Sequence, residues 1–406
     1  MTHPPVSVVV VSRDRPDALV RCLTGILQVQ YTPFEIVVVA DGPGCAAVGQ
    51  WTGQIKVVRF DRPNISEARN LGISHAAGDI VAFIDDDAVP EPSWLTQLVA
   101  PFEQSDVAAA GGFVRGRNGI SFQWKARRVD ETGATAPLDV HPEQATVLMP
   151  KGRSATKTEG TNMAVRRDVL CTLEGFDPAF AFYLDETDLN LRLARAGYAT
   201  VIVPLAEVHH GFAASSRRRV DRTPRDLFDI GASWAVFQRK YMGEPEWGRH
   251  WQSIRTAQRL RCVTHMVAGR LVPGDVARLM RRLDEGYADG SQRQRGGARI
   301  LDTAVAPFKP IAVAPRKSTL MFGRIWQRKK LRAEAARRVE DGDIVTLVLL
   351  SPTALFHHVQ FHEDGYWEQR GGLFGRSERT DPLFTLWRFS RRIARERRRI
   401  AYQRLC

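Results

Sequence analysis

Long hydrophobic runs are missing from this sequence of 406 residues. Its most apolar stretches, residues 6–11 and 344–350, fall far short of the roughly 20 residues that a membrane-spanning helix needs. The N-terminus also lacks the basic segment and the apolar core of a secretory signal peptide. We therefore expect a cytoplasmic protein without membrane spans.

Cysteine is scarce as well, which bears on metal sites and on the redox compartment. The chain has five cysteines, an odd number, and no two of them form a Cys-x-x-Cys pair. This spacing argues against a disulfide framework and against a zinc site. We expect reduced thiols that mostly fill the core. They are Cys22, Cys45, Cys171, Cys262 and Cys406.

The composition is that of a globular protein, but its charge is unevenly distributed. Hydrophobic residues make up 44% and charged residues 25%, which excludes a mainly disordered or fibrous chain. Residues 1–212 hold 19 Lys and Arg against 25 Asp and Glu, a net charge of −6, and residues 213–406 hold 39 against 20, a net charge of +19. A basic half of this kind favours contact with a membrane surface, an anionic acceptor or nucleic acid, and composition does not choose among them.

The first half alternates between apolar strands and amphipathic helices. Residues 7–11, 35–39, 55–60 and 79–84 are apolar runs rich in β-branched residues, typical of strands buried on both faces. Helical patterns lie between them, which predicts an α/β fold with a mainly parallel sheet and helices on both faces. Ligands of such sheets bind at the carboxyl ends of the strands. Those ends carry Ser12, Asp41, Asp85, Asp86 and Asp87.

Asp85, Asp86 and Asp87 form the sharpest single feature of the sequence. Three adjacent carboxylates after an apolar strand repel one another, and a divalent cation offsets that repulsion. Oxygen ligands of this kind suit Mg²⁺ or Mn²⁺, which also bind phosphates. The alternative is a solvated acidic turn before the next helix, and the triplet alone does not exclude it.

A series of short motifs runs along the first half of the chain. They are residues 7–13, Asp41-Gly42, residues 66–72, residues 78–87, residues 160–167, Gly175-Phe176-Asp177, residues 182–189, Arg192, Gly197-Tyr198 and His209-His210. In this order the motifs resemble the donor-binding half of family 2 glycosyltransferases, which have the GT-A fold. Each motif is weak alone, but the resemblance extends from residue 6 to about residue 215, roughly half of the chain.

The resemblance implies roles for several residues. In the family, the aspartate after the second strand holds the nucleobase, and its counterpart is Asp41, whose carboxylate can accept ring N–H groups. Asp87 matches the metal ligand, and the metal, Mn²⁺ or Mg²⁺, would neutralise the diphosphate leaving group. His209 is implied as a further metal ligand, while His210 in its place, or a structural histidine, stays open. The other donor-binding residues implied are Ser12, Arg13, Arg69, Asp85, Asp86 and Asn162.

Residues 185–188, Asp-Glu-Thr-Asp, form a second acidic cluster. The family's usual order is Glu-Asp-x-Asp with the second carboxylate as general base, so the transposed order places the base at Glu186. Glutamate is one methylene longer and has a pKa about 0.4 higher than aspartate, so the pocket must accommodate its extra reach. We predict Glu186 as the catalytic base, Asp185 as the residue that orients it, and a structural role for Asp188. The alternative is a charged helix N-terminus favoured by the helix dipole.

The second half gives weaker signals. Residues 213–226 are rich in arginine, which predicts either a loop that closes over a nucleotide diphosphate or a solvated basic linker. A buried strand is predicted at residues 344–350. Residues 386–406 are predicted to form a basic helix that either lies on anionic lipid or is solvated or docked on the protein. We predict three parts: a GT-A domain over residues 1–215, a helical extension over 216–300, and a basic region over 301–406 with a short strand and a terminal helix.

Together these features and the resemblance predict a metal-dependent glycosyltransferase, and the resemblance implies that it inverts the configuration of the sugar. Its donor would be a UDP-, dTDP- or GDP-sugar, and its acceptor the hydroxyl of a glycan, of a lipid-linked saccharide or of another molecule. The lack of a Gln-x-x-Arg-Trp motif and of membrane spans favours non-processive transfer in cell-surface glycan or glycolipid assembly. The basic region would contact the inner face of an anionic membrane, and no nucleic-acid partner is expected.

Two other functions stay open at this point. A nucleotidyltransferase also needs acidic metal ligands, but residues 12–16 lack the glycine-rich, lysine-bearing loop of that class. An inactive transferase domain joined to a basic half that binds nucleic acid or membranes is the second alternative, and salt-sensitive binding to random nucleic acid would favour it.

Overall fold

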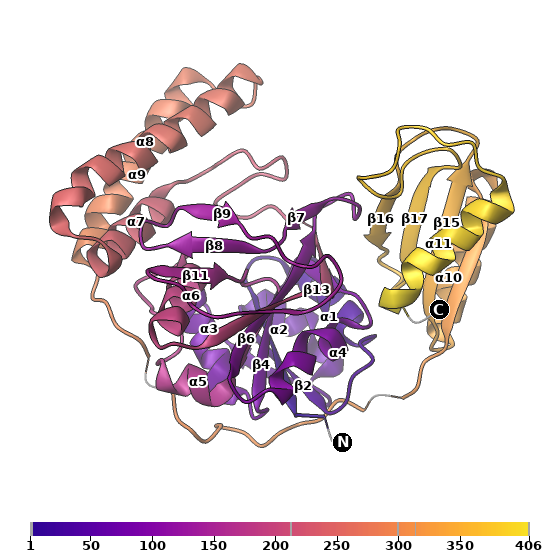
Figure 1. The fold of residues 1–406 in the computed structure, drawn as a ribbon, viewed down its shortest axis with the longest axis horizontal. Coiled ribbons are helices and arrows are strands. Elements are labelled where there is room, and N and C mark those ends of the chain that lie inside the picture. Colours follow the sequence, from indigo (N-terminus) through magenta and orange to yellow (C-terminus); the bar gives the residue numbers. More distant parts are fainter. Residues whose placement is uncertain (1–2, 212, 299, 313, 405–406) are drawn as a thin grey trace.

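The computed structural model describes residues 3–211, 213–298, 300–312 and 314–404. Figure 1 shows an α/β body, a group of helices beside it and a smaller α/β unit built by the C-terminal residues. The chain between the helices and this unit runs along the body. It is tied there by the Val305 N–H to the Ser74 carbonyl (2.9 Å) and by the Ile311 N–H to the Phe34 carbonyl (2.8 Å).

A ten-stranded sheet forms the body, in the order β10-β13-β6-β12-β4-β1-β2-β3, with β5 on β13 and β7 on β6. Strands β3, β2, β1 and β4 are parallel, β12 is antiparallel between β4 and β6, and β6 and β13 are again parallel. This confirms the predicted α/β class with a mainly parallel sheet. The strands are β1 (Val6–Ser12), β2 (Phe34–Ala40), β3 (Lys56–Arg59), β4 (Ile80–Asp85), β5 (Ala88–Pro90), β6 (Val107–Arg115), β7 (Phe122–Trp124), β10 (Thr146–Leu148), β12 (Met163–Arg166) and β13 (Ala199–His210).

Helices cover both faces of this sheet. Val8 and Val10 of β1 belong to the core beneath α1 and α4, whereas Val9 belongs to the core beneath α3. Successive side chains of a strand point to opposite faces, so a sheet covered on both sides needs strands that are apolar throughout. The helices of the body are α1 (Pro16–Ile26), α2 (Gly42–Ala47), α3 (Ile65–His75), α4 (Trp94–Val99), α5 (Arg167–Thr172) and α6 (Asp185–Arg195), with 3₁₀ turns at Gly49–Trp51 and Ala100–Glu103.

A second, three-stranded sheet joins the body to the neighbouring helices. Trp234 and Phe237 of α7 pack with Val129 of β8 and Ala155 of β11. The backbones of helices α7 and α9 are in direct contact at Gly231 and Gly286. A Cβ atom added at either glycine would overlap the main chain of the other helix, so these positions require glycine. These elements are β8 (Arg127–Asp130), β9 (Thr135–Pro137), β11 (Ser154–Lys157), α7 (Phe228–Tyr241), α8 (Glu244–Val267) and α9 (Pro273–Gln292).

The C-terminal unit is a four-stranded sheet, in the order β14-β15-β17-β16, with two helices. The strand predicted at residues 344–350 is β15, a buried interior strand of this sheet. Its neighbours β14 and β17 escaped the sequence pattern, because β14 is only partly buried and β17 carries Glu, Gln and Arg side chains. The elements are β14 (Ser318–Arg324), a 3₁₀ turn (Ile325–Gln327), α10 (Arg328–Glu340), β15 (Ile344–Ser351), β16 (His358–Phe361), β17 (Trp367–Gly372) and α11 (Phe389–Arg404).

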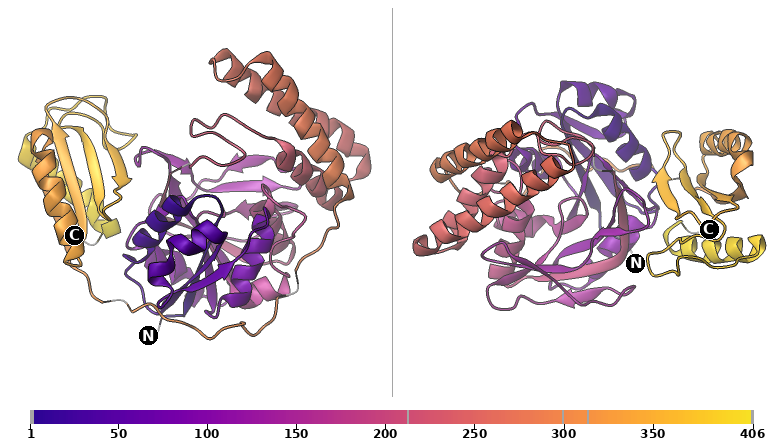
Figure 2. Two further views of the ribbon diagram at one scale, coloured as in Figure 1. Left: turned by 180° about the vertical axis from the view of Figure 1, so that it is seen from behind. Right: turned by 90° about the horizontal axis from the view of Figure 1, so that it is seen from above.

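The C-terminal unit rests against the edge of the body, as the two views in Figure 2 show. Arg404 of α11 donates two hydrogen bonds of 2.8 Å to Glu91, which lies next to β5. The Val359 N–H donates to the Asn118 carbonyl (2.9 Å). Gln28, which follows α1, donates to the Gly365 carbonyl. The two side-chain contacts join residues 313 and 337 positions apart in sequence.

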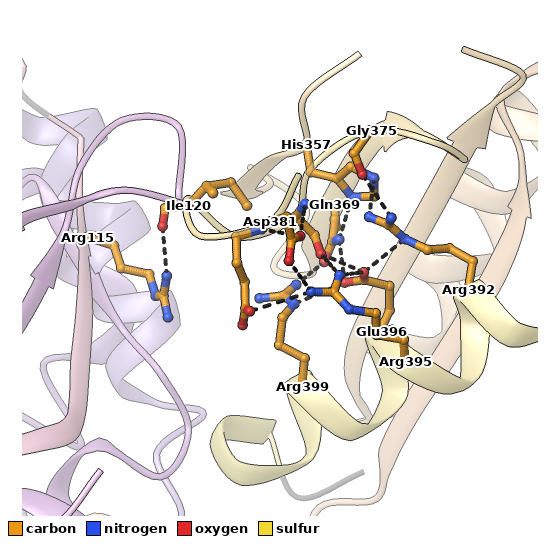
Figure 3. A network of polar contacts seen from close by, with 12 residues as sticks. Arg115, Ile120, His357, Gln369, Gly375, Asp381, Arg392, Arg395, Glu396 and Arg399 are labelled. Carbon is orange, nitrogen blue, oxygen red and sulfur yellow. Dashed lines mark hydrogen bonds and ion pairs between the residues drawn. The ribbon is translucent and has the colours of Figure 1, made fainter. Parts of the chain in front are cut away.

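Helix α11 docks on its own sheet rather than presenting all its arginines to a surface. Figure 3 shows Arg392, Arg395 and Arg399 directed toward carboxylates inside the unit. Arg392 and Glu396 are buried, and Glu396 also accepts a hydrogen bond from Gln369. The helix is therefore docked on the protein, as one of the predicted alternatives had it. None of the helices in the described part of the chain combines the length and the apolar character needed to cross a bilayer.

Candidate active site

Two carboxylates and an imidazole meet where β4 ends. Candidate ligand atoms of Asp85, Asp87 and His210 all lie within 4.8 Å of one another. The His210 Nε2 atom is 3.1 Å from Asp87 Oδ1 and 4.0 Å from Asp85 Oδ2. Residues so distant in sequence meet because β5 pairs antiparallel with β13, with His210 opposite Ala88.

This group fits a divalent cation of the Mg²⁺ or Mn²⁺ type. Carboxylate oxygens suit both ions, and imidazole is an acceptable ligand of Mn²⁺. The Nδ1 atom of His210 lies 3.0 Å from Gln123 Oε1, so Nδ1 can carry the proton and leave the Nε2 lone pair for a metal. The side chain of Asp85 is 31% exposed and borders the cavity described below, whereas that of Asp87 is buried.

His209 does not join this group, contrary to the prediction that it ligates the metal. Its Nε2 atom is 2.8 Å from Glu91 Oε1, and its ring packs on Trp367 of the C-terminal unit. Consecutive strand residues face opposite sides, so His209 and His210 cannot both point to Asp87. Glu91, Glu207 and His209 also lie close together, but both carboxylates already pair with arginines, Arg404 and Arg115.

Asp86, in the middle of the triplet, points into the protein. It accepts a hydrogen bond from Ser12 Oγ (2.7 Å) and pairs with Arg15 (2.6 Å), which also lies 3.3 Å from Asp87. Burial raises the pKa of Asp86 to about 8, against the opposing effect of Arg15. The hydrogen bond between Ser12 and Asp86 therefore joins the end of β1 to the turn that follows β4.

A small cavity of about 130 Å³ lies beside this loop. Its walls include Ser12, Arg13 and Phe60 on one side and Phe182 and Arg218 on the other. Asp41 does not line this cavity. Its carboxylate accepts the backbone N–H groups of Asp14 (2.8 Å) and Gly44 (2.9 Å), and so holds the loop that forms the wall.

A larger cavity of about 780 Å³ opens next to the metal-type group. The residues that line it include Asp85, Asp185 and Glu186. Tyr183 and Leu184, which precede α6, have φ angles of 74° and 66°, in the left-handed region that non-glycine residues rarely adopt. Because α6 begins directly after this turn, its first two residues, Asp185 and Glu186, line the cavity.

The two acidic clusters are linked by one buried arginine. Arg69 of α3 forms an ion pair with Asp185 and lies 3.4 Å from Asp85. The guanidinium therefore holds the start of α6 at the end of β4. The Arg69 side chain is only 6% exposed, and it lines the cavity.

Asp185 and Glu186 differ in their acidity. Burial raises the pKa of Asp185 to about 7, and the neighbouring charge of Glu186 adds to this effect while Arg69 opposes it. Burial acts in the same sense on Glu186, but Lys157, 3.0 Å away, lowers the pKa of Glu186 to about 2. Near neutral pH, Glu186 is thus an ionised carboxylate that can accept a proton.

Asn162 has a different position from the one predicted. Its side chain is fully buried, accepts a hydrogen bond from the Trp94 indole, and donates to the carbonyls of Phe113 and Ala206. Asn162 therefore joins α4, β6 and β13 through its side chain. Gly160 and Thr161 line the cavity instead.

Sequence reasoning missed several residues of the site. Lys157 lies on β11, a short strand with no apolar pattern, and only the fold brings it to Glu186. Arg15 and Arg218 lie within 4.0 Å of Asp87. The arginine-rich run at 213–226 indicated that some of its members could bind phosphate, but not which ones. No pattern in the sequence pointed to Trp124, whose ring stacks on the ring of His210.

Comparisons with known proteins agree with the sequence resemblance. A family model described as glycosyltransferase-like family 2 matches residues 3–228, more than half of the chain. The O-antigen biosynthesis protein RfbC of Myxococcus xanthus is 29% identical over 255 residues, which cover 58% of this chain and 19% of that protein. Glucosyl-dolichyl phosphate glucuronosyltransferase of Haloferax volcanii is 31% identical over 194 residues, which cover 42% of this chain and 56% of that protein.

The chain thus spans less than two thirds of either relative. Among solved structures, the mannosyltransferase PcManGT from Pyrobaculum calidifontis, in complex with GDP-Man and Mn²⁺, is similar with a TM-score of 0.42 and 17% identity. That similarity covers 72% of this chain and 88% of the other. The matched region contains both acidic clusters and the whole ten-stranded sheet. On this evidence the chain belongs to glycosyltransferase family 2.

Proposed function

We propose that this protein transfers single sugars from a nucleotide-diphosphate sugar to an acceptor hydroxyl, with metal assistance and inversion at the anomeric carbon. One observation carries the proposal. The metal-type group (Asp85, Asp87, His210) borders one cavity through Asp85, and the same cavity is lined by Glu186 and by its cationic partner Lys157. Such a cavity can hold a leaving group and a nucleophile at opposite ends.

The donor would span both cavities. The smaller one, beside Arg13 and Phe60, has room for part of a nucleoside. Asp41 would contribute indirectly, because its carboxylate accepts the Asp14 N–H and so fixes the loop that forms the cavity wall. The diphosphate would lie near Arg15 and Arg218, whose guanidinium groups suit phosphate oxygens. A cation held by Asp85, Asp87 and His210 would neutralise charge on the departing diphosphate. UDP-, dTDP- and GDP-sugars all remain candidate donors.

Glu186 would remove the proton from the acceptor hydroxyl as the oxygen attacks the anomeric carbon. The new C–O bond forms on the face opposite the diphosphate, whose C–O bond breaks, and the proton stays on Glu186. Lys157 keeps Glu186 ionised, and Asp185, fixed by Arg69, orients it. Substitution from the opposite face inverts the configuration.

The pH profile of the enzyme tests the role assigned to Lys157. A Lys157→Gln variant loses the cation that lowers the pKa of Glu186, and burial then raises this pKa. We expect the acidic limb of kcat/KM to move to higher pH by at least about one pH unit, since a nearby opposite charge shifts a carboxylate pKa by about 1–3. Arg127→Gln is the matched control, because Arg127 pairs with Glu159 instead. An unchanged profile for Lys157→Gln would contradict the assignment.

A thermal-shift screen tests the proposed function directly. UDP, dTDP and GDP sugars are each added with Mn²⁺, with Mg²⁺ or with EDTA. At a hundred times the dissociation constant, a ligand stabilises the folded state by about 2.7 kcal/mol, which such a screen detects. We expect stabilisation by one base in the presence of metal only. No response to any donor would favour an inactive domain and a binding role for the basic half.

We also propose a glycolipid or cell-surface glycan as the setting, and a peripheral contact with anionic lipid. The names of the relatives RfbC and glucosyl-dolichyl phosphate glucuronosyltransferase are consistent with such a setting. In the C-terminal unit, three loops joined by hydrogen bonds expose a patch of large apolar side chains beside Arg376, Arg379 and Arg388. The patch consists of Leu355, Phe356, Leu383, Phe384 and Leu386.

Binding to lipid vesicles tests this contact. A Phe356→Ser/Phe384→Ser variant is expected to bind vesicles containing anionic phospholipid at least about tenfold more weakly, because burying one such side chain contributes about 1.5–3 kcal/mol. The control is Trp326→Ser, at an exposed tryptophan of the same unit outside the patch. Equal binding of both variants, or no preference for anionic over neutral vesicles, would contradict the proposal.

A further inference from the structure

The C-terminal end of α11 is bonded to the segment that follows β5. Arg404 donates one hydrogen bond of 2.8 Å to each carboxylate oxygen of Glu91. The Ser93 N–H donates to the Gln403 carbonyl (3.2 Å), and Ser93 Oγ donates to Gln403 Oε1 (3.0 Å). All four residues are buried. The two parts of the chain therefore share a closed polar interface rather than a loose surface contact.

Glu91 and the aromatic ring of Trp367 extend this interface to β13. The Oε1 atom of Glu91, which accepts from Arg404, also lies 2.8 Å from His209 Nε2. The ring of His209 packs on Trp367 of β17, with 4.7 Å between the ring centres. The guanidinium of Arg404 lies 4.2 Å from the centre of the same indole. Arg404 thus contacts both partners of His209.

The last two residues of β13 face opposite sides of the strand. His209 faces the C-terminal unit, and Val89, directly opposite it on β5, belongs to the same apolar cluster as Trp367. His210 faces the other way and approaches Asp87, the residue directly before β5. The C-terminal unit therefore covers one face of the pair of strands whose other face carries His210.

Strand β5 is too short to fix this geometry alone. It has three residues and, within the described ranges of the chain, pairs with β13 and with no other strand. A pair of short strands is marginally stable in water, so its position depends on what packs against it. Packing against β5 comes from α1, where Gly25 leaves room for the Val89 side chain, and from the C-terminal unit. Loss of the second support is expected to loosen the place where Asp87 and His210 meet.

From this arrangement we infer that the C-terminal unit positions the metal site. Arg404 and Trp367 are positioning residues: they fix β5 against the end of β13, and so keep the ligands of the metal-type group within range of one cation. Neither residue would contact the metal. A His209→Gln change keeps a donor for Glu91, so the role is assigned to Arg404 and Trp367 rather than to the histidine. The inference rests on the proposed function, because it concerns the same metal-type group.

The test measures binding of Mn²⁺ alone to the whole chain, from the loss of the free-ion signal in electron paramagnetic resonance. In Arg404→Gln, the affinity for Mn²⁺ should fall about tenfold, the lower end of the loss expected when outer partners of metal ligands are removed. Arg404→Lys keeps a positive charge beside Glu91 and should recover part of this affinity. Hydrogen exchange in Arg404→Gln should rise at the N–H groups of β5 and of the end of β13, and stay unchanged in β1.

Arg332→Gln is the matched control. Arg332 of α10 also donates two hydrogen bonds to a buried glutamate of the C-terminal unit, Glu368, which lies on the face of β17 opposite to Trp367. This change should weaken the unit itself but leave its interface with the body in place, so Mn²⁺ should bind as tightly as to the wild type. An equal loss in Arg332→Gln, or an unchanged affinity in Arg404→Gln, would overturn the inference.

A second variant keeps the test independent of the folding of Arg404→Gln. Trp367→Leu removes the indole that contacts His209 and Val89 but keeps an apolar side chain, and it should also lower the affinity for Mn²⁺. Full affinity in a folded Trp367→Leu variant would overturn the role of the indole. A wild type that binds no Mn²⁺ would instead contradict the proposed metal site, and the inference with it, so the two failures are distinguishable.

Discussion

Replacing Glu186 with glutamine is expected to slow sugar transfer by roughly 10²- to 10⁴-fold, the usual contribution of a general base, while donor affinity stays within about twofold. The amide has nearly the same shape as the carboxylate but cannot accept the proton of the acceptor hydroxyl. Lys157 keeps a carboxylate partner in this variant, because Glu159 lies 3.3 Å from its ammonium group. The measurement is release of nucleoside diphosphate from the donor identified in the screen, together with nucleotide-induced stabilisation.

Two companion variants make this result interpretable. Glu285→Gln, at an exposed glutamate of α9 that does not line the cavity, carries the same chemical change and should retain full activity. Asp185→Asn separates the roles within the acidic cluster. If Asp185→Asn were inactive while Glu186→Gln turned over normally, Asp185 would be the base, and the transposed order of these residues would not have moved that function to Glu186.

Replacing Asp87 with asparagine is expected to abolish metal-dependent donor binding. The variant removes a negative charge from the group that would hold the cation, and the nucleotide then loses its link to the protein through the metal. The whole metal-dependent stabilisation, about 2.7 kcal/mol at a hundred times the dissociation constant, should disappear from the thermal-shift screen. Asparagine keeps an acceptor oxygen for the Ala213 N–H, which lies 2.7 Å from Asp87 Oδ2.

The neighbouring histidines offer a matched pair for the same experiment. His210→Gln should weaken Mn²⁺-dependent donor binding, whereas His209→Gln should leave it intact, because the His209 side chain contacts Glu91 and Trp367. Metal-dependent binding that survives in both Asp87→Asn and His210→Gln would contradict the proposed metal site. A loss confined to His209→Gln would return the role to the histidine that the resemblance implied.

Much of the body could be predicted from the sequence because its strands are buried on both faces. Such strands are continuous apolar runs, and their ends are marked by the first polar residues, among them Asp41 and Asp85. The C-terminal unit was less predictable. Its strand β17 includes Glu368 and Gln369, which are buried because partners such as Arg332, Glu396 and Arg399 satisfy them from other elements.

The candidate site also has a part that the sequence predicts and a part that it does not. The two acidic clusters could be found from sequence, because each is a group of like charges at a predicted strand or helix end. The directions of single side chains could not. Asn162 turns into the core and His210 turns to Asp87, 123 positions away, and both outcomes depend on which strands pair.

The sequence by itself therefore determined the α/β class of the body, the family and the types of chemical group at the site, because apolar periodicity and short motifs are local properties of the chain. The tertiary structure decided which histidine approaches Asp87 and which cation pairs with Glu186. Each of these depends on contacts between residues far apart in sequence. Such contacts are set by strand pairing and helix packing, which local patterns do not encode.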